Sequence, residues 1–424
     1  MVKTIKIGLI GLGTVGSGVV RILKAQRDLI QQQTGLVFEV TQAIVANPER
    51  QRDADLQTVS LGTDATQLFN DPTLDVVVEV MGSVAGAKPL IEQALKAHKH
   101  VVTANKDLIA QYGEPLAELA SQNGVTLRYE ASVAGGIPIL QTLRTVYTAD
   151  PVTEIAGILN GTTNFILTQM DEQGLTYDQA LDEAKARGFA ETDPTNDVDG
   201  FDAAYKLGIL TKMAFGISVA QDDIDITGIR ELDINDVRAA RASGYELKLV
   251  GISKQMPAGL QLAITPMVIH EDRPLAKIKN ENNAVWVKST NIGTALYVGP
   301  GAGQLPTGNS VVTDLIQVGK AINRGNRAEP FALKQTSVKP AIVKGNQTYW
   351  LLVAAPNPNS LADNLKLMFE GVQVSQPDTI RGLDPHQTLT SFEIQLPQPV
   401  TTERFINRAQ RLGQVIAAYP VLED

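Results

Sequence analysis

Short apolar runs alternate with longer amphipathic stretches through the first 150 residues. The runs are rich in β-branched residues and read KTIKIGLI, VFEVTQAIV, LDVVVEV, HVVT and GVTLRYEAS. Stretches between them, such as SGVVRILKAQRDLIQQQ and PLIEQALKAHK, repeat apolar residues at helical spacing. Continuous apolar strands are typical of a parallel sheet that helices cover on both faces. The pattern therefore predicts an α/β domain over residues 1–150.

The pattern changes near Thr153. TEIAGILNGTTNFILTQM predicts a strand that breaks at Asn160-Gly161 and a helix capped by Thr162 or Thr163. Segments such as LQLAITPMVI, NAVWVKST and TALYVGPGAG then alternate in the manner of an antiparallel sheet. We expect an inserted α+β catalytic and dimerisation domain at residues 151–301. The stretch GPGAGQLPTGNSVVTDLIQVGKAI predicts a glycine loop and a long helix that return to the first domain at about 302–330.

A third pattern begins after a polar, proline-containing stretch, RGNRAEPFALKQTSVKPAIVKG, which is typical of a linker. From TYWLLVAAPNPNSLADNLKLMF to the end, the chain reads strand, helix, then strand, helix, strand. This order predicts a βαββαβ module of the ferredoxin-like kind at residues 340–424. Such a module at the end of a metabolic enzyme is usually a regulatory or dimerising domain.

The composition of the chain argues against nucleic acid and membrane as its partners. The 424 residues are 43% apolar and 20% charged, with a formal net charge of -9. An acidic chain lacks the basic excess that a nucleic-acid surface requires. No apolar run is long enough to cross a membrane, and the N-terminus leads directly into a strand pattern, so we expect a cytoplasmic protein. The absence of cysteine excludes disulfides, cysteine-ligated zinc and thiol nucleophiles.

A glycine-rich turn follows the first strand and precedes the first helix. Strand, turn and helix in this order place the helix N-terminus against a pyrophosphate, which predicts a Rossmann dinucleotide-binding domain. The first glycine permits the tight turn, the second lets the backbone approach phosphate, and the third lets helix and strand pack closely. The predicted cofactor contacts in this turn are Gly11, Leu12, Gly13, Thr14, Val15 and Gly16.

The end of the second strand should contain the residue that contacts the cofactor ribose. An acid there is typical of NAD sites, but the chain has Ala46 and Asn47, with Arg50 and Arg52 just beyond. This favours NADP over NAD, with Asn47 and Arg50 as contacts, although either arginine can equally be a surface charge. NAD stays an alternative.

Residues that follow the next two strands should also border the cofactor. Ligands of open α/β sheets bind at the carboxyl ends of the strands. Gly82 follows LDVVVEVM, and Thr103 and Lys106 belong to the segment TANK after the strand HVV. Lys106 is either a site residue or a surface charge.

The segment ETDPTNDVDGFDAAYK contains five acids and ends at Lys206. It allows three interpretations: a solvated loop, a calcium loop, or the lining of a catalytic pocket. The calcium pattern fails on spacing. On a helix that starts near Gly200, Asp202 and Lys206 are four residues apart and share a face. A lysine can act as an acid or base when burial or nearby cations lower its pKa, and the acids can bind a substrate ammonium.

A possible cation site follows the strand GVTLRYEAS. Glu130 is followed by small residues and paired glycines in VAGGIPIL. A carboxylate and backbone carbonyls there can together bind a hard cation through oxygen. The alternative is a tight turn with no ligand.

Five motifs, taken together, resemble those of homoserine dehydrogenases. They are GLIGLGTVG, TANK, EASVAGGIPI, GILNGTTNFIL and GFAETDPTNDVDGFDAAYKLGIL, in the same order over residues 1 to 325. The resemblance implies NAD(P)-dependent interconversion of L-aspartate 4-semialdehyde and L-homoserine, a step toward threonine, methionine and isoleucine. The antiparallel sheet of the middle domain offers an edge that two subunits can share, so we expect a homodimer or a dimer of dimers.

The resemblance assigns roles position by position. Lys206 matches the proton donor, and Lys106 the second active-site lysine, which also contacts substrate and cofactor. Glu191 and Asp202 match the acids that hold the substrate, with Asp197 nearby, and Gly301 or Gly303 matches a contact of the cofactor or the substrate. The implied sodium ligands are Glu130, Val133, Gly135 and Ile137.

The C-terminal module departs from the family pattern. Related bacterial chains often end in an ACT domain with an acid and a Pro-Gly after its first strand, whereas this chain has VAAPNPNSLADNL. An ACT-like fold is expected, but the departure removes the basis for predicting a bound effector. Two other functions stay open: an oxidoreductase for another semialdehyde or imine, and a nicotinamide-sensing regulator without turnover.

Overall fold

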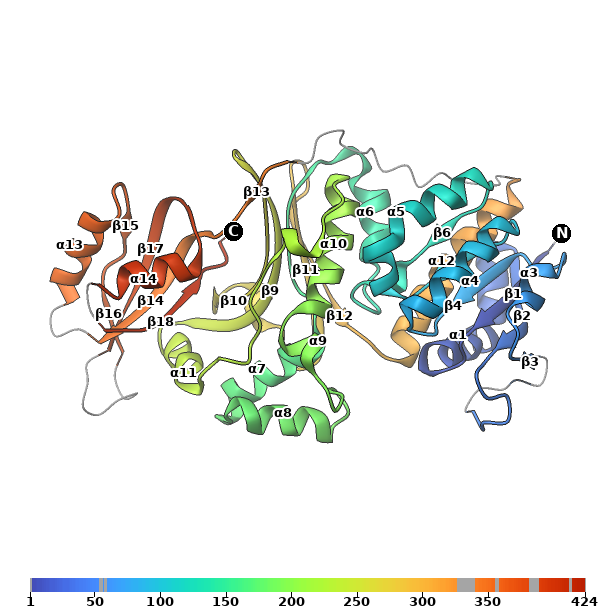
Figure 1. Ribbon diagram of the computed structural model, residues 1–424, viewed down its shortest axis with the longest axis horizontal. Helices are drawn as coiled ribbons and strands as arrows, with labels where there is room; N and C mark the ends of the chain where they lie inside the picture. Colours follow the sequence, from blue (N-terminus) through green and yellow to red (C-terminus); the bar gives the residue numbers. More distant parts are fainter. Residues whose placement is uncertain are drawn as a thin grey trace. The chain divides into compact units, whose positions relative to one another are not determined.

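The computed structural model describes residues 2–52, 56, 59–325, 340–354, 358–380, 389–411 and 414–423 (Figure 1). These residues form two compact units. The first unit contains Met1–Ala149, Gly208–Ser218 and Gly299–Ser337. The second contains Asp150–Leu207, Val219–Val298 and Val338–Asp424.

The first unit is built on a parallel sheet with the strand order β3-β2-β1-β4-β5-β6. This is the doubly wound order of dinucleotide-binding folds, in which the direction of strand addition reverses between β1 and β4. The predicted α/β class and its parallel sheet are therefore confirmed. The strands are β1 (Lys3–Ile10), β2 (Leu36–Ile44), β3 (Ser60–Gly62), β4 (Val76–Glu79), β5 (His100–Thr103) and β6 (Leu127–Arg128).

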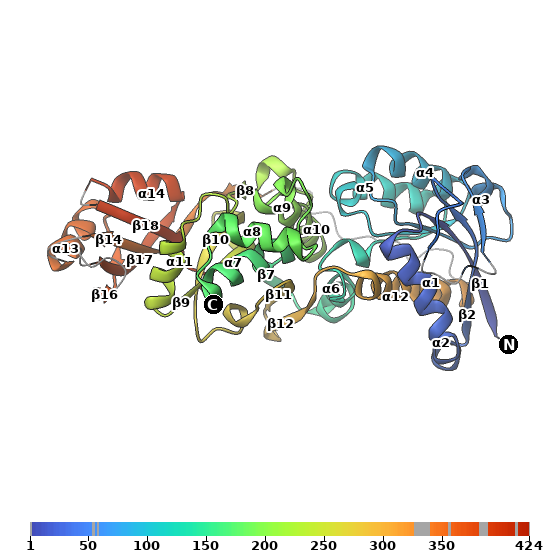
Figure 2. The ribbon, with the colours of Figure 1, turned by 90° about the horizontal axis from the view of Figure 1, so that it is seen from below.

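Helices cover both faces of this sheet (Figure 2). On one face, α1 packs closely against α12: a Cβ on Gly18 would lie 2.1 Å from the carbonyl oxygen of Gln304. The long helix expected after the glycine loop is α12, and it packs against the first helix of the chain. The helices are α1 (Thr14–Ala25), α2 (Arg27–Thr34), α3 (Thr66–Asn70), α4 (Val84–Lys96), α5 (Lys106–Gln122), α6 (Ile139–Thr145) and α12 (Gln304–Asn323).

The second unit contains a mainly antiparallel sheet with the order β12-β11-β7-β9-β10-β13, and β8 also pairs with β10. The alternating segments had predicted this sheet. Its strands are β7 (Val152–Ile158), β8 (Asp225–Ile226), β9 (Tyr245–Met256), β10 (Gly259–His270), β11 (Asn282–Ser289), β12 (Gly293–Pro300) and β13 (Ile342–Val343). The accompanying helices are α7 (Gly161–Gln173), α8 (Tyr177–Ala186), α9 (Thr195–Val198), α10 (Phe201–Phe215) and α11 (Ile234–Ala242). Helix α10 begins in the second unit and ends in the first.

The C-terminal sheet of the second unit has the order β15-β17-β14-β18, with β16 also paired to β17. All of its described pairs are antiparallel, as in a ferredoxin-like βαββαβ module. Apolar side chains from the sheet and both helices form its core, including Tyr349, Leu365 and Phe405. The elements are β14 (Asn346–Ala354), α13 (Pro358–Met368), β15 (Gln373–Val374), β16 (Asp378–Ile380), β17 (Leu389–Val400), α14 (Thr402–Ala409) and β18 (Gln414–Pro420).

None of the described helices has both the length and the hydropathy of a membrane span.

Candidate active site

The glycine-rich turn has room for a ligand at one position and for nothing but hydrogen at the others. Gly11 has a φ of +97°, and a Cβ there would lie 2.8 Å from the carbonyl oxygen of Val80. A Cβ on Gly16 would lie 2.6 Å from the carbonyl oxygen of Gly11. By contrast, a Cβ on Gly13 would meet no described protein atom within 4 Å. The space beside Gly13 is therefore the space that a phosphate group needs.

The N-terminus of α1 faces this turn without a competing anion. Gly13 is the N-cap residue, no side chain caps the helix, and its first turn contains no acid. The first N–H groups of a helix have no partner within the helix, and with the helix dipole they favour phosphate. The turn thus fits the pyrophosphate of a dinucleotide.

The two arginines after β2, which the sequence alone left as equally possible cofactor contacts, differ in their hydrogen bonds. The Arg52 guanidinium donates to the carbonyl oxygens of Asn47, Pro48 and Arg50 at 2.7, 3.3 and 2.7 Å. Arg52 is therefore used to hold its own loop. Arg50 is exposed, as is Asn47, whose side chain accepts the Glu49 amide at 3.0 Å.

Gly82, Thr103 and Lys106 lie at the carboxyl ends of β4 and β5. Gly82 has a φ of +78° and open space where a side chain would be. Thr103 ends β5 and is buried, while Lys106 is the first residue of α5. The Lys106 side chain is 32% exposed, and its Nζ lies 3.7 Å from Asp107 Oδ1. The sheet thus brings these three predicted residues to one edge.

Glu79 at this edge was missed by sequence reasoning. It ends β4, is fully buried, and accepts hydrogen bonds from the Met81 amide at 2.8 Å and the Thr103 hydroxyl at 2.6 Å. The signal was present in the sequence, because Glu79 is the only charged residue in the apolar stretch VVVEVM.

Glu130 is buried just after β6, and its carboxylate already accepts hydrogen bonds from the protein. Its carboxylate accepts the amides of Leu140 at 2.9 Å and Gln141 at 2.6 Å, and its own amide donates to Asp314 at 2.7 Å. Burial, followed by the charge of Asp314, raises the pKa of Glu130 to about 7.

The loop after Glu130 is sharply bent. Ala134 and Gly135 both have left-handed backbone, with φ of +53° and +51°. The Gly135 carbonyl accepts the Ser310 hydroxyl at 2.6 Å, and a Cβ on Gly135 would lie 2.3 Å from the carbonyl oxygen of Gly301. Among the described residues, no three His, Cys, Asp or Glu side chains gather as a metal site would require.

In the second unit, Lys206 and Asp202 form a largely buried ion pair on α10. Lys206 Nζ lies 2.6 Å from Asp202 Oδ2 and donates to the Leu159 carbonyl at 2.7 Å. The two side chains are only 11% and 9% exposed. An ammonium group has three donors, so these two bonds leave one N–H of Lys206 for a ligand oxygen. The prediction that Asp202 and Lys206 share one face of a helix is confirmed.

Asn160 links Asp197 to the Asp202–Lys206 pair. It also caps α7, a role predicted for Thr162 or Thr163. Its Nδ2 donates to Asp197 Oδ1 at 2.7 Å and to Asp202 Oδ2 at 2.9 Å, while its Oδ1 accepts the Thr163 amide at 2.8 Å. Asn160, and neither Thr162 nor Thr163, is therefore the N-cap of α7. A short amide side chain accepts the helix N–H readily from this position.

The other acids of the segment lie apart from this cluster. Asp193 accepts the amide and hydroxyl of Thr195, and Asp199 pairs with Arg230. Glu191 is exposed in the loop before α9. The structure thus brings together Asp197, Asp202 and Lys206 from the predicted set, and leaves Glu191 at the surface of its unit.

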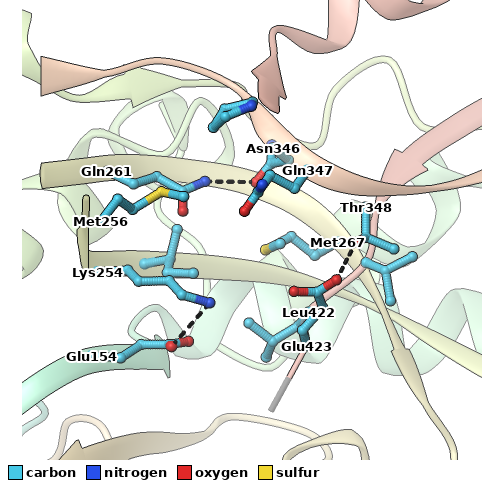
Figure 3. A pocket seen from close by; sticks show the side chains of 13 residues that line it. Glu154, Lys254, Met256, Gln261, Met267, Asn346, Gln347, Thr348, Leu422 and Glu423 are labelled. Atoms are coloured by element: carbon cyan, nitrogen blue, oxygen red, sulfur yellow. Dashed lines mark hydrogen bonds and ion pairs between the residues drawn. The ribbon is translucent and has the colours of Figure 1, made fainter. Parts of the chain in front are cut away.

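A separate polar pocket lies in the second unit, where strands of the middle sheet meet the C-terminal segment (Figure 3). Its polar side chains face one another in pairs: Glu154 with Lys254 at 3.2 Å, Gln261 with Asn346 at 2.9 Å, and Thr348 with Glu423. None of the predicted site residues is among the described residues that line it.

Comparison with known proteins gives one consistent result. Residues 11–130 match the family described as "Homoserine dehydrogenase, NAD binding domain", and residues 138–316 match "Homoserine dehydrogenase". The homoserine dehydrogenase of Bacillus subtilis is 42% identical over 329 residues, which are 78% of this chain and 76% of that protein.

Two solved structures extend the comparison. A homoserine dehydrogenase from Thiobacillus denitrificans aligns with a TM-score of 0.88 and 35% identity over 99% of each chain. A homoserine dehydrogenase of a hyperthermophilic archaeon, solved in complex with NADPH, aligns with a TM-score of 0.62 and 26% identity. That alignment covers 74% of this chain and 97% of the archaeal one.

Proposed function

Because the chain belongs to the homoserine dehydrogenase family, we propose that Lys206 carries out the proton step of the reaction that this family catalyses. That reaction is the NAD(P)-dependent interconversion of L-aspartate 4-semialdehyde and L-homoserine. It supplies homoserine for the biosynthesis of threonine, methionine and isoleucine. The observation that supports the proposal is the remaining N–H of an enclosed Lys206, held by Asp202 and Leu159.

The two bonded partners of Lys206 fix the direction of its ammonium group. In the reducing direction, the third N–H donates to the aldehyde oxygen, and its proton passes to that oxygen as the carbonyl becomes an alcohol. In the oxidising direction, the neutral amine takes the proton back from the homoserine hydroxyl. The nicotinamide cofactor, when bound, would supply the hydride to the carbonyl carbon in one direction and accept it from that carbon in the other. Asp202 holds the Lys206 ammonium group in place for this proton transfer.

Asp197 and Asp202 supply the negative charge for the substrate ammonium. Asn160 donates one hydrogen bond to each, so the two carboxylates are held on one amide group. A rigid pair of acids binds an ammonium without first losing side-chain freedom. Glu191 and Lys106 complete the proposed substrate contacts, as the family resemblance implies.

The residues around the glycine turn support a nicotinamide dinucleotide, and we assign NADP as the preferred form. Arg50 is the exposed cation near the ribose position, whereas Arg52 is engaged by its own loop. A guanidinium suits the 2′-phosphate that distinguishes NADP from NAD. Replacing Arg50 by Ala should raise the KM for NADPH on the order of tenfold and leave that for NADH within about twofold. Equal changes for both cofactors would argue against this role.

Two finer parts of the proposal concern a cation and the oligomer. We place sodium at Glu130 and the carbonyls of Val133, Gly135 and Ile137. This requires the Gly135 and Ile137 carbonyls to bind the ion beside their present donors, the Ser310 hydroxyl and the Ile139 amide. Assays with sodium, potassium or tetramethylammonium as the sole cation test it. Equal rates in all three would remove the cation from the mechanism.

We further propose a homodimer or a dimer of dimers. Strand β12 is an edge of the middle sheet, and its Val298 is 52% exposed. An unpaired edge with apolar side chains favours pairing with a second chain. Sedimentation equilibrium should give at least twice the mass of the chain, and a monomer would contradict this.

The direct test of the function is formation of homoserine from aspartate 4-semialdehyde and NADPH, with the product identified by mass spectrometry. Turnover of another semialdehyde or imine in its place would indicate a different amino-acid oxidoreductase. Cofactor binding with no turnover of any such substrate would indicate a sensor.

A further inference from the structure

A buried carboxylate that the reaction does not use lies at the carboxyl end of β4. Glu79 is fully buried, yet it touches no cation among the described residues. Burying a charge without a cation is costly, and an apolar side chain would fill the same space at lower cost. The position therefore calls for an explanation beyond packing.

The hydrogen bonds of Glu79 reach the two segments that follow β4 and β5, where the cofactor contacts Gly82, Thr103 and Lys106 are predicted. One oxygen accepts the amide of Met81, which precedes Gly82. The other accepts the Thr103 hydroxyl, and Thr103 Oγ1 in turn accepts the Asn105 amide at 3.0 Å.

The network continues into α5 and toward the glycine turn. Asn105 caps α5 by accepting the Leu108 amide at 3.1 Å, immediately beside Lys106. On the other side, the carbonyl oxygen of Val80, which follows Glu79, would lie only 2.8 Å from a Cβ on Gly11. One carboxylate thus fixes two loops and the start of one helix.

We propose that Glu79 is a positioning residue for the nicotinamide end of the cofactor site, and that its negative charge favours the oxidised cofactor over the reduced one. The proposal rests on the cofactor site proposed above. Ligands of doubly wound folds bind outside the carboxyl ends of the strands at the switch point, which lies between β1 and β4 here, so Glu79 at the carboxyl end of β4 borders the proposed site. An oxidised nicotinamide ring carries a positive charge and a reduced ring does not. A fixed anion in a water-poor site therefore stabilises the oxidised form selectively.

Burial and hydrogen bonding act in opposite directions on the pKa of Glu79, and burial is the larger of the two. Burial raises its pKa, and the bonds from Thr103 and from the amides of Met81 and Gly82 oppose that rise.

The test measures cofactor binding in the absence of substrate, by fluorescence titration of the full-length protein with NADP+ and with NADPH. Glu79→Gln retains the shape of the side chain and removes its charge. It should weaken NADP+ binding on the order of tenfold and NADPH binding by less than about threefold. Glu79→Asp keeps the charge but shortens the reach, so both affinities should fall by the same factor.

Asp75→Asn is the matched control. Asp75 accepts a backbone amide, that of Lys6 at 2.8 Å, just before the opposite end of β4. Its replacement should change neither affinity. Circular dichroism and the Tm establish that each variant is folded, and the Glu79→Asp result stands by itself if Glu79→Gln does not fold.

The result that would overturn the proposal is an unchanged ratio of NADP+ to NADPH affinity in Glu79→Gln, or unchanged affinities in Glu79→Asp. These outcomes are separable from failure of the proposed function. If the wild-type protein binds both cofactors and forms homoserine while the ratio stays constant, the inference about Glu79 alone is wrong.

Discussion

Lys248 is a single residue whose burial has a measurable consequence. It lies on β9 and is 1% exposed, with its ammonium bonded to the Ile278 carbonyl at 2.8 Å and to Asn164 Oδ1 at 3.3 Å. Burial, followed by the charge of Lys279, lowers the pKa of Lys248 to about 8. The folded protein therefore binds the Lys248 proton less tightly than the unfolded chain does.

We predict that the contribution of Lys248 to the free energy of unfolding rises with pH. Between pH 8 and the ordinary lysine pKa, the unfolded chain binds more protons, so stability increases through that window and the full penalty is present below it. The difference between wild type and Lys248→Met should increase by up to about 3 kcal/mol across the window. Denaturant unfolding at several pH values measures it. The exposed Lys96→Met is the control, and a flat difference for Lys248 would contradict the prediction.

Single residues also show the limit of reasoning from sequence. The pairing of Asp202 with Lys206 was predictable because a helix brings residues four apart together. The bonds of Asn160 to Asp197 and Asp202 were not, since they join residues 37 and 42 positions apart. A polar residue at the end of a buried strand gives no indication of which distant carboxylate it will meet until the sheet is assembled.

At the scale of elements, the turn between β1 and α1 separates glycines that serve folding from one that serves binding. Gly18 needs its small size because α12 packs against it, and Gly16 because the turn folds back on it. Gly13 has no such neighbour. The motif predicted the roles of Gly13 and Gly16, because these follow from backbone geometry. It did not predict the role of Gly18, which depends on the packing of α12.

We predict opposite effects for two alanine substitutions on this element. Gly13→Ala should change the free energy of unfolding by less than about 1 kcal/mol, but raise the Kd for NADPH on the order of tenfold or more, because the methyl group occupies phosphate space. Gly18→Ala should lower the Tm, since its Cβ would lie 2.1 Å from a backbone oxygen. Calorimetry and cofactor titration measure the pair. Normal NADPH binding by Gly13→Ala would place the pyrophosphate elsewhere.

Element types were predicted more reliably than their ends. Apolar runs identified the parallel sheet and alternation the middle sheet. The predicted start of α7 was wrong because Asn160, Thr162 and Thr163, which lie within four residues, can each cap a helix. The first strand of the C-terminal module was expected to lead into VAAPNPNSLADNL, and part of that stretch lies outside the described residues.

At the scale of the whole molecule, the C-terminal module follows the two regions that match the family models, which end at residue 316. The archaeal relative aligns over 97% of its own length with only 74% of this chain. In the second unit, Leu422 belongs to the apolar cluster of the middle sheet, and its amide donates to the Val268 carbonyl at 3.0 Å. The module therefore contributes to the stability of that sheet. Sequence periodicity predicted the module but not this contact, which depends on where the last residues of the chain pack.

We predict that a chain ending at Gly325 keeps homoserine dehydrogenase activity and loses stability. Its kcat should stay within about threefold of wild type, whereas its Tm falls because the cover over the middle sheet is removed. Leu422→Ala in the full chain is the matched variant and should lower the Tm without affecting kcat. A truncated chain that is folded and inactive would show that the module takes part in catalysis.

The most direct test of the account is the reduction of aspartate 4-semialdehyde by Lys206→Met with NADPH as the cofactor. Losing the proton donor should lower kcat on the order of a hundredfold or more, while the Kd for NADPH stays within about twofold, since the predicted cofactor contacts lie elsewhere in the chain. Lys212→Met is the control, because Lys212 lies further along α10 and pairs with Glu114 at 3.7 Å. It should retain the wild-type rate. A folded Lys206→Met protein with wild-type kcat would contradict the central claim.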